Sequence, residues 1–347
     1  MKYARLLILF VGACSGSQPE LSPDDVGDMS SDVPASDAGS ADAEPLDAGP
    51  EDVGDQMLRE IVQLEMDSDM ACVLWSDGEV ECWGKNVEEF QAAPSSDLRF
   101  RRIEVEGTGL FCGVTTENNA HCVQPVLESD PSWIELDVAR ETSGDVREIH
   151  LGEVGRTCIL GTDNEIECNN GDEPPVFTSV PAGPFDSLSV HFEIACALRP
   201  DGTATCFGDP DPVDSEMIGS PEPAQGPFLE IHAGRLFHCG LLETGAIRCW
   251  GVDDPTFVTP PPDGVFTTMA LGGTTGCAIR AEDSRVECWR LGAEPPDVEF
   301  KLVAAENQLG CGVTLDDKVA CWTRDPDGFF NEGQIIPVPE HLAYEAP

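Results

Sequence analysis

The chain has 347 residues, 41% of them hydrophobic, so it can bury a sizeable core in one large or two ordinary domains. Its 65 acidic residues outnumber its 19 basic residues, which gives a formal net charge of −46. Because such a charge repels phosphate backbones and anionic lipid headgroups, the composition excludes nucleic acid as an expected partner.

The first residues have the layout of a secretory signal. Lys2 and Arg5 precede an apolar run at residues 6–13 that is too short to span a bilayer. No other segment approaches the roughly eighteen apolar residues of a transmembrane helix. We therefore expect any membrane attachment to be through lipid alone.

The end of this run, VGAC at residues 11–14, resembles the lipobox of bacterial lipoproteins. The resemblance implies that residues 1–13 are removed and that Cys14 is lipidated, with palmitate among the attached chains. The alternative is an ordinary signal peptide followed by a chance cysteine. Ser15 favours the outer membrane by the same resemblance, with the protein either periplasmic or exposed at the surface.

Residues 14–56 are expected to form a disordered acidic linker behind this anchor. The stretch from 15 to 55 contains twelve acidic residues, no Lys or Arg, and no aromatic residue that could seed a core. Charge repulsion should extend the linker. A folded domain is then expected over residues 57–347.

The other fourteen cysteines fall into seven local pairs. The pairs are Cys72 with Cys82, Cys112 with Cys122, Cys158 with Cys168, Cys196 with Cys206, Cys239 with Cys249, Cys277 with Cys288, and Cys311 with Cys321. Their first members recur at intervals of 34 to 46 residues. A regular period of this length is typical of a repeat architecture.

Each pair encloses a predicted β-hairpin whose arms alternate apolar and polar residues with period two. In six units the bend fits a three-residue loop whose last member must adopt a left-handed conformation. The residues at that place are Gly78, Asn118, Asn164, Gly202, Gly245 and Asp317. Asp317 is the least comfortable occupant, because it has neither the freedom of glycine nor the tolerance of asparagine.

This register places the two cysteines of a unit opposite each other, on the face that carries the aliphatic residues. Cross-strand Cα atoms about 4.5 to 5.5 Å apart suit a disulfide. Metal sites and redox centres usually contain close-spaced C-x-x-C pairs, which the chain lacks. Seven disulfides within hairpins are therefore predicted, with free structural thiols or a metal site as alternatives, and they fit an oxidising compartment.

A further apolar strand signal precedes each first cysteine by about eight to eleven residues. The signals are Leu58 and Ile61, Phe100 and Ile103, Val146 and Ile149, Phe185 and Leu188, Phe228 and Ile231, Phe266 and Met269, and Phe300 and Val303. Each unit then has at least three short strands, and one such sheet cannot bury both of its faces. Seven sheets arranged radially can, so we predict an all-β, seven-bladed β-propeller over residues 57–347.

The hairpins resemble repeats of the regulator of chromosome condensation family, which run roughly C-x-L-x-x-D-G-x-V-x-C-W-G. CVLWSDGEVECWG at 72–84 and CGLLETGAIRCWG at 239–251 match well. The resemblance implies a propeller. Its functional implications are diverse, since the namesake is a nucleotide exchange factor that binds chromatin, and other members are photoreceptors or β-lactamase inhibitors. No segment matches the exchange wedge, so no functional residue is carried over.

Two sets of aromatic residues have different expected roles. Trp83, Trp250, Trp289 and Trp322 share one repeat position and are expected to pack between blades. Trp133 lies in a long connector, where aromatic anchors are more common, and is a candidate contact residue.

The hairpin bends carry acidic residues that should form a rim around one face. They are Asp77, Glu117, Asp163, Asp201, Glu243, Asp283 and Asp316. Such a rim could bind Ca²⁺ or a basic partner. The alternative is that these residues simply form good turns.

Catalytic motifs are absent from the sequence. It has six histidines but no nucleophile elbow, phosphate loop or H-E-x-x-H, so neither a catalytic residue nor a cofactor is assigned. We expect a monomeric, non-catalytic scaffold that binds an envelope or extracellular protein or glycan. The alternatives are a secreted propeller hydrolase or lyase acting on carbohydrate, which a carboxylate cluster in the central channel would favour, and, more remotely, an exchange factor.

Overall fold

The computed structural model describes most of the predicted domain. The described residues are 59–67, 70–84, 97–106, 110–124, 134–136, 145–152, 156–169, 177, 179–208, 226–235, 237–251, 260–273, 275–323 and 338–345. The chain divides into two units, residues 1–54 and 55–347, and all described residues belong to the second. The predicted signal, Cys14 and the linker lie outside the described residues.

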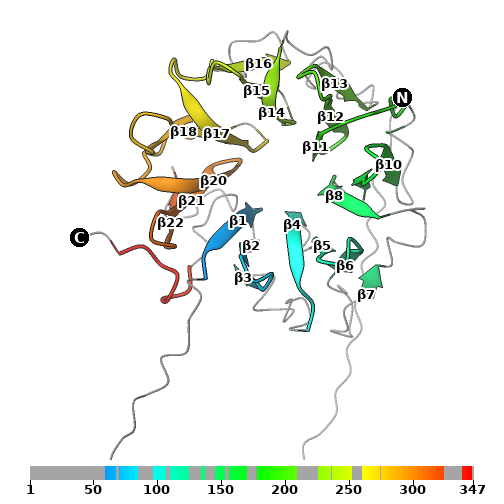
Figure 1. Cartoon of the computed structure of the whole chain (residues 1–347). Helices are drawn as coiled ribbons and strands as arrows, with labels where there is room; N and C mark the ends of the chain where they lie inside the picture. The colour runs from blue at the N-terminus through cyan, green and yellow to red at the C-terminus, as the bar shows by residue number, and fades with distance from the viewer. Residues whose placement is uncertain are drawn as a thin grey trace, which may run out of the picture. The chain divides into compact units, whose positions relative to one another are not determined.

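Every regular element in the described part of the chain is a β-strand, and the strands form seven antiparallel sheets around a centre (Figure 1). The first three blades contain β1 (Ile61–Met66), β2 (Met70–Trp75) and β3 (Val80–Gly84); β4 (Phe100–Glu106), β5 (Leu110–Thr115), β6 (Ala120–Gln124) and β7 (Ile134–Leu136); and β8 (Val146–Leu151), β9 (Thr157–Gly161) and β10 (Ile166–Asn169).

The other four blades have three strands each. They contain β11 (Ser187–His191), β12 (Ile194–Leu198) and β13 (Ala204–Phe207); β14 (Phe228–His232), β15 (Phe237–Leu242) and β16 (Ile247–Gly251); β17 (Phe266–Leu271), β18 (Gly276–Arg280) and β19 (Val286–Trp289); and β20 (Phe300–Glu306), β21 (Leu309–Thr314) and β22 (Val319–Thr323). The prediction of an all-β, seven-bladed propeller is confirmed, and no helix in the described residues could cross a membrane.

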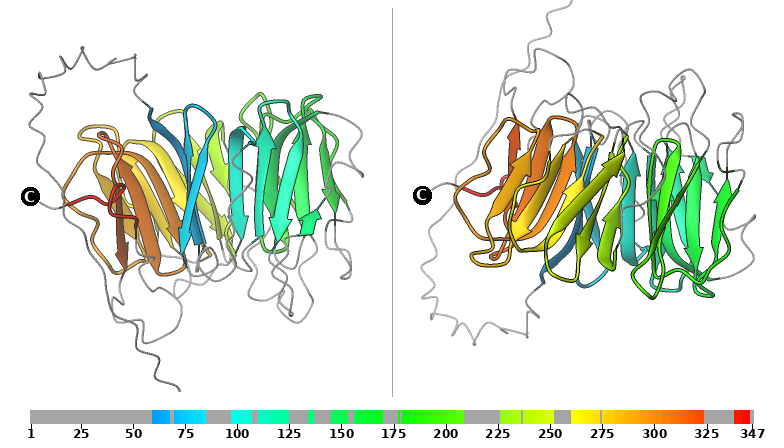
Figure 2. Two further views of the ribbon diagram at one scale, coloured as in Figure 1. Left: turned by 90° about the horizontal axis from the view of Figure 1, so that it is seen from below. Right: turned by 90° about the horizontal axis from the view of Figure 1, so that it is seen from above.

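The strands run across the thickness of the ring, as the edge-on views in Figure 2 show. In each blade the first strand lies nearest the centre and the third lies outward, with β7 added outside β6 in the second blade. The seven innermost strands, β1, β4, β8, β11, β14, β17 and β20, therefore surround the axis.

All seven predicted disulfides are present, one between the second and third strands of each blade. The bonds join Cys72 to Cys82, Cys112 to Cys122, Cys158 to Cys168, Cys196 to Cys206, Cys239 to Cys249, Cys277 to Cys288, and Cys311 to Cys321. In every blade the two cysteines lie directly opposite each other in the strand register. The hairpin disulfides predicted from the spacing are thus confirmed.

One detail of these disulfides differs from the sequence argument. The Cα atoms of the paired cysteines are 3.9 to 4.1 Å apart, closer than the expected 4.5 to 5.5 Å. This separation is also shorter than the ~4.4 to 6.8 Å usual between the Cα atoms of disulfide-bonded cysteines.

The hairpin bends have the predicted left-handed residues. Positive φ angles occur at Gly78, Asn118, Asn164, Gly202, Gly245 and Asp317, with Asp317 at 60°. In the sixth blade, whose loop is one residue longer, Ser284 takes this conformation at 58°. The loop chemistry therefore fixes the register that aligns the cysteines.

The core consists of layers between neighbouring blades. Cys72 and Leu74 of β2 pack with Phe100 and Ile103 of the second blade, while Val73, on the opposite face of β2, packs toward the seventh blade. Both faces of this middle strand are buried, which is the reason a blade needs two neighbours. The seven layers together form one closed ring of core.

The repeated tryptophans belong to these layers, as expected. Trp83, Trp289 and Trp322 are buried at 4 to 5% exposure within inter-blade clusters. Trp250 is half-buried, and its ring centroid lies 5.6 Å from that of Phe228.

One strand signal needs correction. Phe100 pairs with Thr115 at the start of β4, and the equivalent pair in the first blade is Ile61 with Trp75. The first blade's apolar pair is therefore Ile61 and Leu64 rather than Leu58 and Ile61. Leu58 and Ile61 have the same three-residue spacing as the apolar pairs of the other blades, so the sequence alone does not exclude them. The strand register shows that Ile61 and Leu64 are the equivalent pair.

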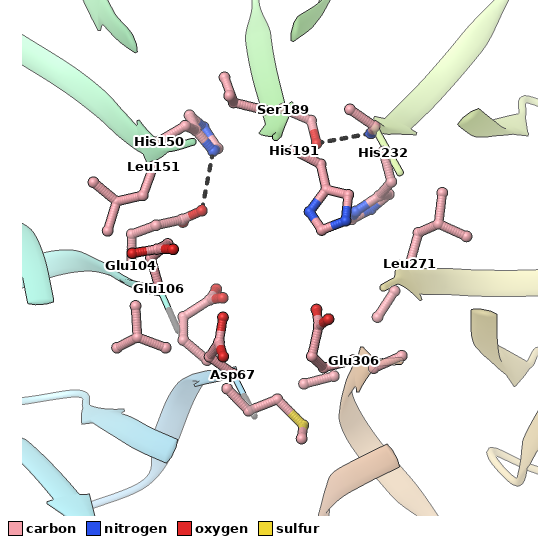
Figure 3. Close-up of a pocket in the computed structure, with 18 of the residues that line it drawn as sticks. Asp67, Glu104, Glu106, His150, Leu151, Ser189, His191, His232, Leu271 and Glu306 are labelled. Carbon is pink, nitrogen blue, oxygen red and sulfur yellow. Dashed lines mark hydrogen bonds and ion pairs between the residues drawn. The ribbon is translucent and has the colours of Figure 1, made fainter. Parts of the chain in front are cut away.

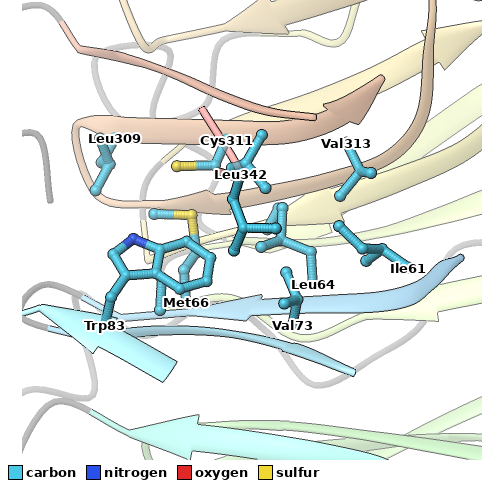
Figure 4. Packing of buried hydrophobic residues seen from close by; sticks show 12 residues of the cluster. Ile61, Leu64, Met66, Val73, Trp83, Leu309, Cys311, Val313 and Leu342 are labelled. Carbon is cyan, nitrogen blue, oxygen red and sulfur yellow. The ribbon is translucent and has the colours of Figure 1, made fainter. Parts of the chain in front are cut away.

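The ring closes through the C-terminal segment. Leu342 packs with Leu64, Trp83 and Val313, in a cluster shared by the first and seventh blades (Figure 4). Ala343 forms a parallel bridge with Val319 on β22, so the segment 338–345 joins the outer edge of the last blade.

Candidate functional site

The innermost strands enclose a central cavity of about 700 Å³. Side chains from all seven blades line it, and Figure 3 shows the labelled ones projecting inward. The volume lies within the ~300 to 1,000 Å³ typical of small-molecule sites.

Acidic side chains gather on one side of this cavity. Asp67 follows β1, Glu104 and Glu106 belong to β4, and Glu306 ends β20, so the acids come from the first, second and seventh blades. We call Asp67, Glu104, Glu106 and Glu306 the acidic arc. The acidic arc therefore concentrates carboxyl groups on one side of the cavity.

Two carboxyls at this side retain protons near neutral pH. Burial, together with the charges of Asp67 and Glu106, raises the pKa of Glu306 to about 8. Burial and then the charge of Glu104 raise the pKa of Glu65 to about 8, although a hydrogen bond from Gln63 opposes the shift. An approaching cation would relieve this repulsion and release a proton.

Histidines from the third, fourth and fifth blades occupy the other side (Figure 3). His150 lies 3.5 Å from Glu104 and 3.3 Å from Glu148. Burial alone would lower the pKa of His150, but these carboxylates outweigh it and raise the pKa above its usual value.

His191 is in a different electrostatic state. Burial, with smaller contributions from His238 and Arg235, lowers the pKa of His191 to about 3. Its imidazole is therefore neutral at physiological pH. Its Nε2 is buried and has no hydrogen-bond partner among the described residues.

Side chains of the innermost strands also form hydrogen bonds with backbone amides on the innermost strands of neighbouring blades. Gln63 accepts a hydrogen bond of 3.0 Å from the amide of Ile103, and Glu148 accepts one of 3.2 Å from the amide of Leu188. Glu230 makes the equivalent contact with the amide of Met269, and Ser189, further along its strand, accepts a hydrogen bond from the amide of Ala233. Since the innermost strands do not pair with each other, these contacts satisfy edge amides that would otherwise lack partners.

The cavity combines carboxyl groups with space for a ligand of several atoms. Ca²⁺ requires six to eight oxygen ligands at about 2.3 to 2.6 Å from one point. No group of three or more His, Cys, Asp or Glu side chains in the described residues meets the geometry of a metal site. The acidic arc instead surrounds a space large enough for an amine or guanidinium group.

The predicted acidic rim lies at the hairpin bends, where several of its members form local turn contacts. Asp77, Asp163 and Asp201 each accept a hydrogen bond of 3.0 to 3.1 Å from the amide two residues later. Asp283 accepts one of 3.2 Å from the amide of Arg285, and Asp316 accepts one of 2.6 Å from the hydroxyl of Thr314. These contacts support the turn-forming role for five of the seven rim residues, which leaves Glu117 and Glu243 as the other two.

The remaining candidates have separate locations. Trp133 lies outside the described residues. His232 is in β14 and pairs with Glu230 at the cavity, and His238 is fully buried beside Cys239.

The cavity residues were missed in the sequence analysis, although a signal existed. When the repeats are aligned on the residue equivalent to Phe100, Asp67, Glu106, His191 and Glu306 share the seventh position. That position is glycine in the three other blades, so it forms no motif.

Comparisons with known proteins support the fold. No family model matches the chain. The CRINKLY WD40 ectodomain of the Arabidopsis thaliana receptor kinase ACR4 is similar at 21% identity and a TM-score of 0.62, over 81% of this chain and 100% of that one. The ectodomain of the Physcomitrella patens receptor kinase CR4 has 21% identity and a TM-score of 0.60, over 77% and 74%. Human WBSCR16 has 10% identity and a TM-score of 0.53, over 71% and 85%. At these identities the similarity concerns the fold alone.

Proposed function

We propose that the chain is an envelope-anchored lipoprotein whose propeller binds a cationic group in its central cavity without chemical conversion. The acidic arc carries this proposal, because Asp67, Glu106 and Glu306 from three blades face one cavity, and burial with the charges of Asp67 and Glu106 raises the pKa of Glu306 to about 8. The ligand class is an amine or guanidinium group carried by an envelope or extracellular protein or glycan.

The location is part of the proposal. The seven disulfides support an oxidising compartment, in agreement with the secretory signal. The outer-membrane anchor at Cys14, the monomeric state and membership of the regulator of chromosome condensation family rest on the sequence motifs.

Calorimetric titration with spermidine and with a trilysine peptide tests the cavity. Glu106→Gln removes one charge from the acidic arc and should weaken binding about tenfold or more, the equivalent of ~1.4 kcal/mol. Asp201→Asn removes one charge from the hairpin rim and is the matched control. Equal weakening by both variants would show binding to the general acidic surface and would overturn the proposal, as would wild-type affinity in Glu106→Gln.

Cross-linking on intact cells can then identify the natural partner. A partner captured through the cavity should be recovered with wild type and with Asp201→Asn, but reduced with Glu106→Gln. Equal recovery with all three proteins would place the partner elsewhere on the propeller.

A carbohydrate-active hydrolase or lyase is the second candidate, and the same cavity favours it. Glu306 keeps its proton to a pKa of about 8 beside the carboxyls of Asp67 and Glu106. A protonated acid next to carboxylates is the pairing that glycoside hydrolases use. Cleavage of envelope glycans by wild type and not by Glu306→Gln would establish this function in place of simple binding. An exchange-factor activity gains no support from the cavity.

A further inference from the structure

A second cavity of about 450 Å³ adjoins the first near the opposite ends of the innermost strands. It is lined by Val62, Gln63, Glu65, Leu74, Arg101, Arg102, Arg147 and Glu148. These residues belong to the first three blades. Three of the eight are arginines in a chain with only 19 basic residues.

The arginines are poorly matched by carboxylates. Arg147 has one ion pair, at 3.9 Å from Glu148. No carboxylate in the described part of the chain lies within ion-pairing distance of Arg101 or Arg102. The carboxyls act on these two guanidinium groups from beyond ion-pairing distance: Glu148 opposes the lowering of the Arg101 pKa, and Arg102 opposes the rise in the Glu65 pKa.

The hydrogen-bonding capacity of these arginines is also incompletely used. Arg101 donates one bond, of 2.6 Å, to the carbonyl of Val146. Arg102 contacts His150 at 3.2 Å, while its Nε is buried and has no partner in the described residues. A guanidinium group presents five N–H donors in a planar fork, so both arginines have donors available for a ligand.

The wall of this cavity is positive at neutral pH. Burial and the neighbouring charge of Arg102 lower the pKa of Arg101, an effect to which Arg147 adds. Glu65 is largely protonated, since its pKa is about 8. Glu148 is then the one ionised carboxylate among the lining residues, against three arginines.

We propose that this cavity binds a small organic anion through a phosphate, sulfate or carboxylate group held between Arg101 and Arg102. The planar arginine fork matches the geometry of these oxyanions and binds them in a bidentate manner. Val62, which is 43% exposed, supplies an apolar contact for the organic part. The cavity of about 450 Å³ exceeds the size of a single oxyanion, which favours an anion with an organic body.

The anion site is distinct from the acidic arc. The cavities share Glu65, Arg102 and Glu148, but Arg101 and Arg147 line the second alone, and Glu106 and Glu306 line the first alone. Cation binding and anion binding can therefore be tested with different substitutions. Glu106→Gln should leave anion binding intact, and Arg101→Gln should leave spermidine binding intact.

Calorimetric titration of wild type with inorganic phosphate, sulfate, citrate and glucose 6-phosphate tests the anion site. We expect saturable binding of at least one organic anion, weakened about tenfold or more in Arg101→Gln. Arg101→Lys should give an intermediate loss, because lysine retains the charge without the fork. Arg101 is exposed, so its replacement should not prevent folding.

Arg59→Gln is the matched control, since Arg59 pairs with Asp77 and Glu79 on the surface and its loss changes the net charge equally. This variant should bind anions as wild type does. If wild type binds none of the anions at ligand concentrations up to about 10 mM, the proposal is overturned, because a specific site should bind more tightly than that. Equal losses in Arg59→Gln and Arg101→Gln would also overturn it.

Discussion

The carboxylate of Asp317 accepts a hydrogen bond of 2.6 Å from the backbone amide of Ile61, which lies 256 residues earlier in the chain. At the other six contacts between consecutive blades, the amide of the equivalent residue donates to a backbone carbonyl in the bend of the preceding blade. The amide of Phe100, for example, donates to the carbonyl of Gly78 at 2.8 Å. Asp317 also forms an ion pair of 2.7 Å with Lys301. One side chain thus replaces a backbone acceptor where the ring closes.

Asp317→Ala should therefore destabilise the propeller by about 1 to 3 kcal/mol, because it leaves the Ile61 amide without its acceptor and removes the nearer of the two ion-pair partners of Lys301. Chemical unfolding monitored by tryptophan fluorescence measures this. Asp317→Asn is the control, since asparagine keeps an acceptor oxygen and tolerates the left-handed backbone. Equal stability of the alanine variant and wild type would show that the hydrogen bond does not hold the ring closed.

The hairpins and the closure differ in how far the sequence predicts them. Two cysteines ten residues apart with a glycine or asparagine at the bend specify a stapled hairpin locally, so the fold follows from their repetition. The contact between Asp317 and Ile61 joins the ends of the chain and has no local signal. The sequence does show that Asp317 is an unfavourable residue for a left-handed loop position. The hydrogen bond that it accepts from the amide of Ile61 explains why aspartate occurs there.

The central cavity was less predictable. Its residues come from strands about forty positions apart, and the seventh position of the innermost strand varies between Glu106, His191 and Gly152. A repeat motif is recognised because the same residue recurs in every unit. The cavity residues differ from blade to blade, so they do not form such a motif.

Glu65 should make stability fall as the pH rises. Its pKa is raised from 4.5 to about 8 in the folded protein, so its contribution is fully present below pH 4.5 and is lost by pH 8. The slope is at most about 1.4 kcal/mol per pH unit. Glu65→Gln should remove this part of the dependence while keeping an oxygen for Gln63. Free energies of unfolding at several pH values test this, and identical slopes for both proteins would contradict it.

His238 should act in the opposite direction. Burial lowers its pKa from 6.5 to about 4, so its contribution is present above pH 6.5 and is lost as the pH falls toward 4. Its Nδ1 accepts a hydrogen bond of 3.3 Å from the amide of Gly234. His238→Asn keeps an acceptor near that position and should be less sensitive to acid. Comparing the acid limb of the stability profile, rather than absolute stability, isolates the effect.

Cys14 should anchor the protein to the membrane. Palmitate labelling and membrane fractionation of cells producing Cys14→Ala should show loss of the label and release from the membrane fraction. Retention of both by the variant would contradict the lipoprotein interpretation. Conversion of Cys14 leaves all seven hairpin disulfides in place, so the folded propeller serves as the internal control.

The most direct test of cation binding in the central cavity is the pH dependence of the affinity for spermidine, measured in wild type and in Glu306→Gln. A cation favours ionised Glu306, whose pKa is about 8 in the free protein, so the wild-type affinity should rise from pH 6 to pH 8 and then level off. Glu306→Gln should bind more weakly at pH 8 and show a smaller rise, which Glu65 with its pKa of about 8 still supplies from the same cavity. A wild-type affinity that does not change with pH, or a rise of undiminished size in Glu306→Gln, would contradict the account.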